Sequence, residues 1–299
     1  MATVGDLIEN VYDLVLGGRR AATVAVLYTT VNTTATSVVV SSDTDDTFAV
    51  GDIVEAADEQ LLVTAVSHPT RTLTVIRGWS GTTAAAHTAG DILYVGPVVS
   101  QRQVRKAIFD EIKALPPKLW SVTAYDLTTT LNALFYQVTG LPDDATILGT
   151  VGVYLGPTTG DQAVIWNTVP FRMVRNLSST SSGVVGIQLL DYPGSDRTLR
   201  VNVATTFTTD DTDSDVVTDD IGLDVSWLDI VEYGAAARII GRLESVRALS
   251  DRASSGTDTG KVGQGTRANT ASWFSRQRDR RMSDAHLALR GRYPFMVEA

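Results

Sequence analysis

The chain has 299 residues, of which 43% are hydrophobic, and its formal net charge is −9. This length allows one large domain or two or three small ones with real cores, and the lack of cysteine excludes disulfides and thiolate metal sites. No apolar run reaches the roughly 18 residues that a membrane span needs, and the first residues lack the basic start of a secretion signal, so we expect no membrane association.

The charge is unevenly distributed along the chain. From Val231 to the end there are 12 Lys and Arg against 7 Asp and Glu, which leaves 13 of the 25 basic and 27 of the 34 acidic residues in the remainder. An acidic body argues against general nucleic-acid binding. The basic C-terminal part permits a local contact with an acidic partner, although chance produces such splits in ordinary soluble proteins too.

The first predicted helix runs from Val4 to Leu16 and ends at Gly17-Gly18. Its apolar residues recur at helical spacing on one side: Leu7, Ile8, Val11, Leu14 and Val15. A β-rich block follows from Ala22 to Val98. Runs such as Thr23 to Tyr28 and Gln60 to Val66 are typical of strands, and about five short strands predict a compact barrel or sandwich.

Within this block, the loop from Arg77 to Asp91 is the most informative segment. It joins two predicted strands, Thr72 to Ile76 and Ile92 to Val95, and it is punctuated by glycine and nearly uncharged. An Arg-Gly, a Gly-Thr, a run of small residues, a histidine and a glycine follow one another in it. We expect the ring of His87 to brace the loop backbone rather than to act in catalysis.

The second predicted helix runs from Gln101 to Leu115, and Ser100 with Gln103 forms a capping box at its start. The segment from Leu119 to about Thr209 then alternates strand-like runs with turns, which predicts a β-sandwich. An acidic segment from Asp210 to Asp224 closes this second β-rich block.

The third predicted helix starts after Ser226 and continues to about Ser250. A linker rich in Gly, Ser and Thr covers Ala253 to Asn269, and an arginine-rich fourth helix covers Ala271 to Arg290. The chain ends in an apolar extended tail. We expect this tail to pair with another segment, because an exposed apolar strand promotes aggregation.

None of these helices can bury its apolar stripe alone, so the helices before and after each β-rich block must meet. The sequence therefore predicts an α+β fold with a discontinuous helical core, two inserted β-rich modules and a helical C-terminal arm. The small barrel or sandwich is the first module, and the β-sandwich is the second. The predicted parts are the core at 1–21, 99–118 and 225–252, the modules at 22–98 and 119–224, and the arm with its flexible linker at 253–299.

The sequence contains no recognisable catalytic constellation, so we expect no enzyme, no cofactor and no metal. The histidines His68, His87 and His286 lie far apart and lack metal-ligand spacing. The carboxylates from Asp210 to Asp215 begin like a calcium loop, but Val216 stands where that loop needs glycine and Gly222 where it needs a bidentate glutamate. A solvated acidic loop is expected there, with loose cation binding as the alternative.

Four closely spaced arginines, between Arg276 and Arg281, mark the last predicted helix, and two aromatic residues precede them. A solvated helix face, a protein–protein contact with an acidic partner and a direct phosphate contact all account for the arginines. The aromatic residues fit a core or an interface, because aromatic side chains beside arginine are typical of interface hot spots. We assign an interface with a partner protein or another subunit to Trp273, Phe274, Arg276, Arg278, Arg280, Arg281, Tyr293 and Phe295.

Three features together resemble the neck proteins of tailed bacteriophages, of the head-to-tail adaptor or connector kind found in actinobacterial phages. They are the Arg77 to Asp91 loop, the helix Gln101 to Leu115 with the Pro116-Pro117-Lys118-Leu119-Trp120 that follows it, and the two C-terminal helices with a spacer and an extended tail. The order of elements resembles that of the family over most of the chain. A definite sequence motif is shared only in the Arg77 to Asp91 loop. Small adaptors of this kind are mostly helical, and the two β-rich blocks depart from that pattern.

The resemblance implies a structural virion protein that forms a homo-oligomeric, dodecameric ring between the portal protein and the next neck or tail protein. DNA would pass through its channel without sequence-specific contact, and the ring would be assembled in the host cytoplasm. The alternative is a peripheral virion protein, such as a decoration, fibre-base or receptor-binding protein, with β-modules that bind sugars. The aromatic residues available for sugar stacking are Trp79, Tyr94, Trp120 and Trp166.

Overall fold

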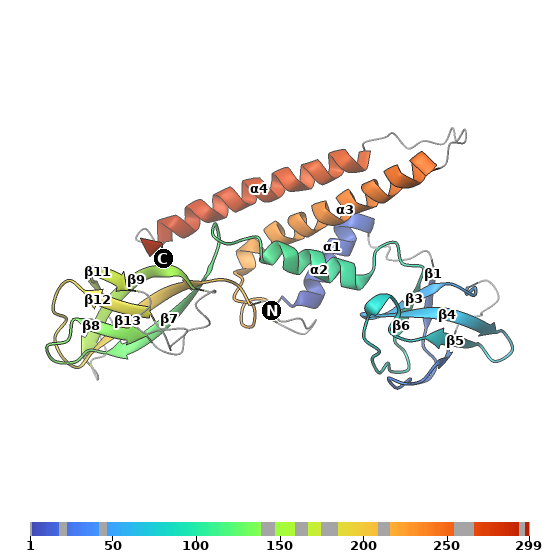
Figure 1. Cartoon of the computed structure of the whole chain (residues 1–299), viewed down its shortest axis with the longest axis horizontal. Helices are drawn as coiled ribbons and strands as arrows, with labels where there is room; N and C mark the ends of the chain where they lie inside the picture. The colour runs from blue at the N-terminus through green and yellow to red at the C-terminus, as the bar shows by residue number, and fades with distance from the viewer. Residues whose placement is uncertain are drawn as a thin grey trace. The chain divides into compact units, whose positions relative to one another are not determined.

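The computed structural model confirms the predicted α+β class, because the residues it describes form four α-helices and several antiparallel sheets (Figure 1). The chain divides into two compact units, and each of them combines one β-module with helical segments. One unit comprises Gly5–Ile108 and Glu232–Phe274, and the other comprises Met1–Val4, Phe109–Val231 and Ser275–Ala299. The described residues are 2–17, 23–41, 47–138, 147–158, 167–174, 185–208, 216–253, 266–292 and 297–298.

The first β-module is a six-stranded antiparallel sheet that curls on itself. Its strand order is β1-β6-β3-β4-β5-β2, and its first and last strands approach each other at an isolated bridge between Leu27 and Val40. The backbone N–H of Tyr28 donates to the carbonyl of Val39 at 2.8 Å, which closes that edge. The strands are β1 (Thr23–Val26), β2 (Ser37–Val39), β3 (Ile53–Ala56), β4 (Glu59–Ser67), β5 (Thr72–Ile76) and β6 (Ile92–Val95).

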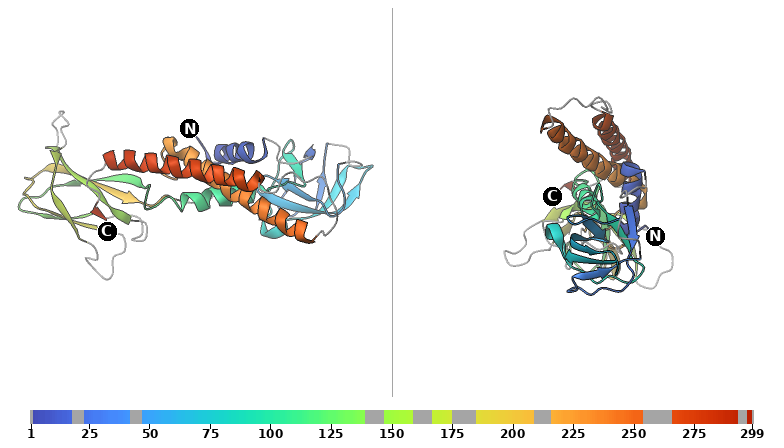
Figure 2. Two further views of the ribbon diagram at one scale, coloured as in Figure 1. Left: turned by 90° about the horizontal axis from the view of Figure 1, so that it is seen from above. Right: turned by 90° about the vertical axis from the view of Figure 1, so that its right-hand side faces the viewer.

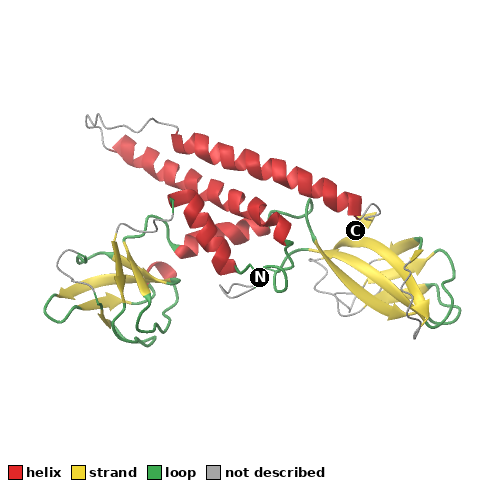
Figure 3. Cartoon of the chain, turned by 180° about the vertical axis from the view of Figure 1, so that it is seen from behind, coloured by secondary structure: helices red, strands yellow, loops and turns green. Residues whose placement is uncertain are grey.

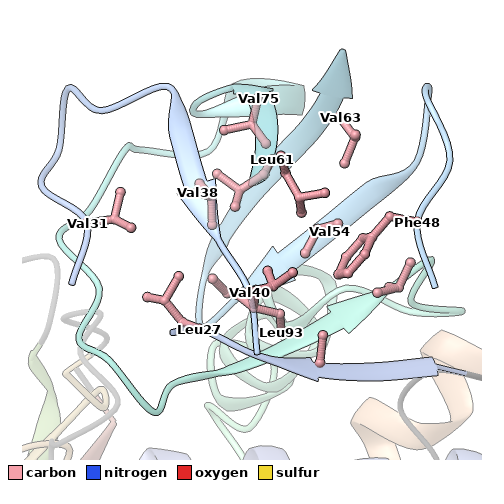
Figure 4. Packing of buried hydrophobic residues seen from close by; sticks show 14 residues of the cluster. Leu27, Val31, Val38, Val40, Phe48, Val54, Leu61, Val63, Val75 and Leu93 are labelled. Atoms are coloured by element: carbon pink, nitrogen blue, oxygen red, sulfur yellow. The ribbon is translucent and has the colours of Figure 1, made fainter. Parts of the chain in front are cut away.

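Alternation along these strands builds the core of the first module. In β1 the buried Ala25 lies between the exposed Val24 and Val26, because successive side chains of a strand point to opposite faces. The inward side chains converge inside the curled sheet (Figure 4), and ten of them are labelled there: Leu27, Val31, Val38, Val40, Phe48, Val54, Leu61, Val63, Val75 and Leu93.

The helices of the same unit begin with α1 (Val4–Leu16) and continue with the N-terminal part of α2 (Gln101–Ile112). The predicted capping box is confirmed: the N–H of Gln103 donates to the Ser100 hydroxyl at 3.2 Å, and the N–H of Ser100 donates to the Gln103 side chain at 3.3 Å. A small apolar cluster joins α1 to α3 (Leu228–Ala253) and α4 (Thr266–Arg292), and the three helices can be followed in Figure 2. Its members in this unit are Val15, Tyr233, Ala236, Ala237, Ile240, Ala271 and Phe274.

The second β-module consists of two antiparallel sheets that share one core (Figure 3, strands in yellow). One sheet has the order β10-β9-β13-β7, and the other has the order β11-β12-β8. Buried residues from both sheets, among them Val138, Val153, Ile187 and Val201, form a single apolar cluster, as in a sandwich. The strands are β7 (Ser121–Thr128), β8 (Phe135–Val138), β9 (Ile147–Thr158), β10 (Asn167–Thr168), β11 (Phe171–Val174), β12 (Val185–Leu189) and β13 (Arg197–Thr205).

The predicted pairing of the C-terminal tail is confirmed. The last strand, β14 (Val297–Glu298), pairs antiparallel with β9 of the second module, where Val297 lies opposite Thr150. The other end of the chain is held in the same unit, because Thr3 forms a bridge with Val216. Both chain ends therefore contribute backbone pairing to this unit.

The helix boundaries differ from the prediction where local backbone rules decide them. The N–H of Ala114 donates to the carbonyl of Glu111, and that of Leu115 to Ile112, so the end of the second helix tightens into 3₁₀-type turns before Pro116. Helix α4 starts at Thr266 instead of Ala271, directly after the last glycine of the predicted linker. The described residues also form two short 3₁₀ turns: η1 (Trp79–Gly81) and η3 (Val225–Trp227).

Adjacent residues of β12 provide a test of the shared core. Ile187 is fully buried between the two sheets, whereas the next residue, Gln188, is exposed. We expect Ile187→Ala to lower the free energy of unfolding by about 2–5 kcal/mol through lost burial and a cavity, and Gln188→Ala to change it by less than about 0.5 kcal/mol. Urea unfolding followed by circular dichroism measures both, and equal losses for the two variants would contradict the assignment of faces.

Candidate functional site

The Arg77 loop is organised around one buried carboxylate, that of Glu59. Glu59 opens β4, and Arg77 follows the last residue of β5. The Nε and Nη2 groups of Arg77 donate to the two carboxylate oxygens of Glu59, each at 2.7 Å. The Glu59 side chain has no solvent exposure and that of Arg77 only 7%, so this is a bidentate ion pair inside the protein.

The loop itself supplies further donors to the same carboxylate. The backbone N–H of Gly78 donates to Oε1 and that of Ala85 to Oε2, both at 3.0 Å. The ring Nε2 of His87 lies 2.9 Å from Oε2. Glu59 thereby holds the start, the middle and the end of the loop to the first residue of β4.

Arg77 extends the connection to a second loop. Its Nη1 donates to the carbonyls of Asn32 and Ala35 at 2.7 and 2.9 Å, and its Nη2 also donates to the carbonyl of Ala85. These bonds and those to Glu59 use all five guanidinium N–H donors. A buried arginine whose donors are all satisfied is a structural element, because it has none left for a ligand.

Gly78 is required for the turn that starts the loop. Its φ is +62°, in the left-handed region, and a Cβ placed on it would lie 2.8 Å from the carbonyl oxygen of Thr82. Any other residue would meet both backbone strain and a clash with main chain. The Arg-Gly pair in the sequence therefore combines an ion-pair residue with the residue that the backbone needs beside it.

The surroundings of Glu59 keep it ionised. Burial alone raises the pKa of a carboxyl group, but the hydrogen bonds from Arg77, Ala85, His87 and Gly78 outweigh it and lower the pKa of Glu59 from 4.5 to about 2. A general acid or base needs a pKa near the working pH and access to a substrate. Glu59 has neither property, so we interpret this site as a clamp on the loop.

The ring of His87 was expected to brace the loop backbone, but its close contact is with the carboxylate of Glu59. The ring contacts the Glu59 carboxylate, while the backbone of His87 pairs with Val31, with its N–H 2.9 Å from the Val31 carbonyl. Glu59 itself was missed in the sequence, where Asp58-Glu59 looks like an ordinary acidic turn. A strand-opening acid followed by an Arg-Gly at the end of the next strand is the signal that identifies it.

The eight residues assigned to an interface have different environments. Phe274 is 5% exposed and packs in the helical cluster, so it belongs to the core rather than to a surface. Trp273 is half-exposed and meets the rings of Tyr233 and Phe274 edge-on. The residues Tyr293 and Phe295 lie outside the described part of the chain.

Two of the four α4 arginines assigned to the interface are engaged within their own unit. The Nε of Arg278 donates to the carboxylate of Glu111 at 2.6 Å, and Glu111 is 2% exposed. Arg281 donates to Asp229 at 2.5 Å. These pairs hold α4 to α2 and to the start of α3, which is a structural role.

The other two, Arg276 and Arg280, are exposed on α4. They are four residues apart and therefore share a helix face. Arg278 and Arg281 are therefore ion-paired with acidic residues of the same unit, and the side chains of Arg276 and Arg280 are exposed.

The other residues considered for chemistry fall into structural positions. Trp120 is 2% exposed, so it cannot stack on a sugar, and its ring lies edge-on to that of His286 at 6.4 Å. Trp166 and the carboxylates from Asp210 to Asp215 lie outside the described ranges. Within the ranges that are described, no three His, Asp or Glu side chains gather to hold a metal ion.

No described helix combines the length and the hydropathy that crossing a bilayer requires. No protein-family model matches the chain, and a comparison with curated proteins finds no match. The resemblance to phage neck proteins therefore remains a hypothesis that depends on the residues quoted for it.

Replacing Glu59 tests the clamp. In Glu59→Gln the size of the side chain is kept, but the buried guanidinium of Arg77 loses its counter-charge. We expect a loss of about 3–5 kcal/mol in the free energy of unfolding, measured by urea denaturation. Asp13→Asn is the matched control, because Asp13 is exposed on α1 and should cost less than about 0.5 kcal/mol; equal effects would refute the clamp.

The pH dependence of stability provides a second test of Glu59. Because its pKa is lowered from 4.5 to about 2, its stabilising contribution is complete above pH 4.5 and is lost as the pH falls toward 2. The lost contribution is about 3 kcal/mol. We expect the stability difference between the wild type and Glu59→Gln to be constant at neutral pH and to shrink as the pH falls from 4.5 toward 2. A difference that does not change with pH would show that the hydrogen bonds to Glu59 do not keep it ionised.

Proposed function

We propose that the chain is a structural virion protein that forms a ring joining the portal of the head to the tail, with a channel for DNA. The observation that carries this proposal is the division of the α4 arginines. Arg278 and Arg281 fix the C-terminal part of the helix, from Ser275 on, within its unit, and Arg276 and Arg280 are exposed on this part. A rigid helix that presents two arginines is suited to contact an acidic protein surface.

The Arg77 loop supports a structural role in the same way. Arg77 and His87 are the loop side chains most suited to catalysis or ligand binding, and both bind the carboxylate of Glu59 inside the first module. The loop thereby stabilises a compact module. The acidic character of the body of the chain suits a channel through which DNA slides, because phosphate binding needs clustered Lys and Arg.

A head-to-tail ring repeats one heterologous contact until it closes. Two compact units in one chain suit such an assembly, because different parts of the same protomer can face different neighbours. The dodecameric ring, its place between the portal and the next neck or tail protein, and its assembly in the host cytoplasm follow from the resemblance and belong to this proposal.

Imaging of purified phage particles tests the location. We expect a cryo-EM reconstruction to place a ring of this chain between head and tail, and gold-labelled antibodies against the chain to bind there. Absence of the chain from mature particles would refute the proposal. Label on the capsid surface or on fibres would instead favour the peripheral virion protein, for which Trp79, 36% exposed, is an aromatic residue still available to a sugar.

A variant pair tests the role of α4. Arg276→Glu with Arg280→Glu should lower binding to the isolated portal protein at least about tenfold, because charge reversal across a contact is repulsive. Arg290→Glu is the control, because Arg290 is also exposed on the same helix but lies outside the predicted interface. Unchanged binding by the double variant, measured by biolayer interferometry, would remove α4 from the portal contact.

A further inference from the structure

One end of the second β-module carries five large apolar side chains that face solvent. They are between 42% and 70% exposed, and we call them the tip patch: Leu131, Leu134, Phe135, Leu190 and Tyr192. Leu131 and Leu134 lie in the connection between β7 and β8, Phe135 opens β8, and Leu190 and Tyr192 follow the end of β12; Figure 1 labels these strands. Scattered exposed apolar residues are normal on a protein surface, whereas the largest contiguous apolar patch of a protein often marks an interaction site.

Hydrogen bonds join the two segments of the tip patch. The N–H of Asn132 donates to the hydroxyl of Tyr192 at 3.0 Å, and the N–H of Leu189 donates to the carbonyl of Leu134 at 2.8 Å. Phe135 lies opposite Gln188 in the β8–β12 register, which makes Leu190 its diagonal neighbour on the outer face. The patch is therefore contiguous and fixed in shape before any partner binds.

A second apolar group lies on the outer face of the first β-module. Val24, Val26 and Tyr28 follow one another at alternate positions of β1 and its extension, and Ile92 of β6 lies directly opposite Val26. We call these four residues the β1 face, and they are between 37% and 66% exposed.

The β1 face is unusual because its strand is apolar on both sides. The inward residues Ala25 and Leu27 belong to the module core, and the outward residues are apolar as well. A strand with this pattern is typically covered on both faces, whereas a solvated outer face normally carries polar side chains. The outer side of β1 therefore has the composition of a surface that is covered in an assembly.

The two groups together match the apolar content of one protein–protein interface. The exposed areas are roughly 500 Å² for the tip patch and roughly 400 Å² for the β1 face, each as large as the biggest apolar patch of a typical monomer. A standard interface buries about 1,600 Å², of which somewhat more than half is apolar. The sum of the two patches is close to that apolar share.

We infer that the tip patch of one copy packs against the β1 face of a second copy of this chain. Two different apolar surfaces on one protomer define a heterologous contact, in which each copy uses its tip on one neighbour and its β1 face on the other. This inference rests on the self-assembly that the proposed function requires, and it names the residues that form the contact between subunits.

Two variants of the full chain separate the two surfaces. The tip variant carries Leu131→Asp and Leu190→Asp, and the face variant carries Val24→Asp and Tyr28→Asp. All four positions are exposed, so we expect both variants to fold, and thermal melting checks this. Val50→Asp is the control, because Val50 is equally exposed in the first module and lies outside both surfaces. Sedimentation velocity over a concentration series measures the association of each protein alone and of the mixed variants.

We expect the wild type and Val50→Asp to self-associate, and each variant alone to associate at least tenfold more weakly. An equimolar mixture of the two variants should form a complex that stops at two chains, because only one intact tip and one intact β1 face remain to meet. A wild type that stays monomeric at all concentrations overturns the inference, as does a face variant that still dimerises alone, which would indicate a tip-to-tip contact.

The two proposals fail separately. Absence of the chain from the phage neck would remove the proposed function and leave a measured self-association intact. A monomeric wild type in the sedimentation series would remove the tip-to-face contact and leave the location of the chain in the particle to the imaging experiment.

Discussion

The first β-module depends on a buried charge that the rest of its loop is arranged to satisfy. Glu59 has no exposed side-chain surface, and an unpaired carboxylate in such a place is very unfavourable. Arg77, His87 and two backbone N–H groups converge on it. The loop takes its path because each of these donors has to reach one carboxylate, and the left-handed Gly78 provides the turn that makes this possible.

A second buried carboxylate, that of Glu111, is also paired with an arginine, and this pair joins two helices. Glu111 is buried at the end of α2, and Arg278 of α4 reaches it from far away in the sequence. Long-range ion pairs of this kind define which face of α4 turns inward, because the arginine must follow its partner. The outward direction of Arg276 and Arg280 is a consequence of that constraint, and the proposed contact with an acidic portal surface depends on it.

The exposed apolar groups add a different kind of information. The satisfied buried charges explain how the first module and the helices hold their shape, but they give no reason for the side chains of the tip patch or of the β1 face to be apolar. An assembly gives that reason, because surfaces that meet a neighbour lose their contact with water. One interpretation therefore fits three observations: the chain is a protomer that joins other copies and partners. The observations are the resemblance to neck proteins, the exposed arginines Arg276 and Arg280 on α4, and the two apolar surfaces.

Local rules were sufficient for much of this chain. Helical spacing and the Gly17-Gly18 stop gave α1 its observed limits, the Ser100–Gln103 capping box is present as expected, and strands such as β5 and β6 lie where alternation predicted them. Each of these features depends on residues a few positions apart, so the sequence carries the signal directly.

The sequence by itself determined the α+β class, the order of helices and β-modules, and the importance of the Arg77 loop. Only the tertiary structure decided which side chains meet: that Arg77 and His87 share Glu59, that Phe274 is core while Arg280 is surface, and that Leu131 and Tyr192 lie at one tip. Such pairs are brought together by chain folding over long separations, and residue spacing contains no record of that, because any acid, arginine or aromatic of suitable size satisfies the local pattern equally well.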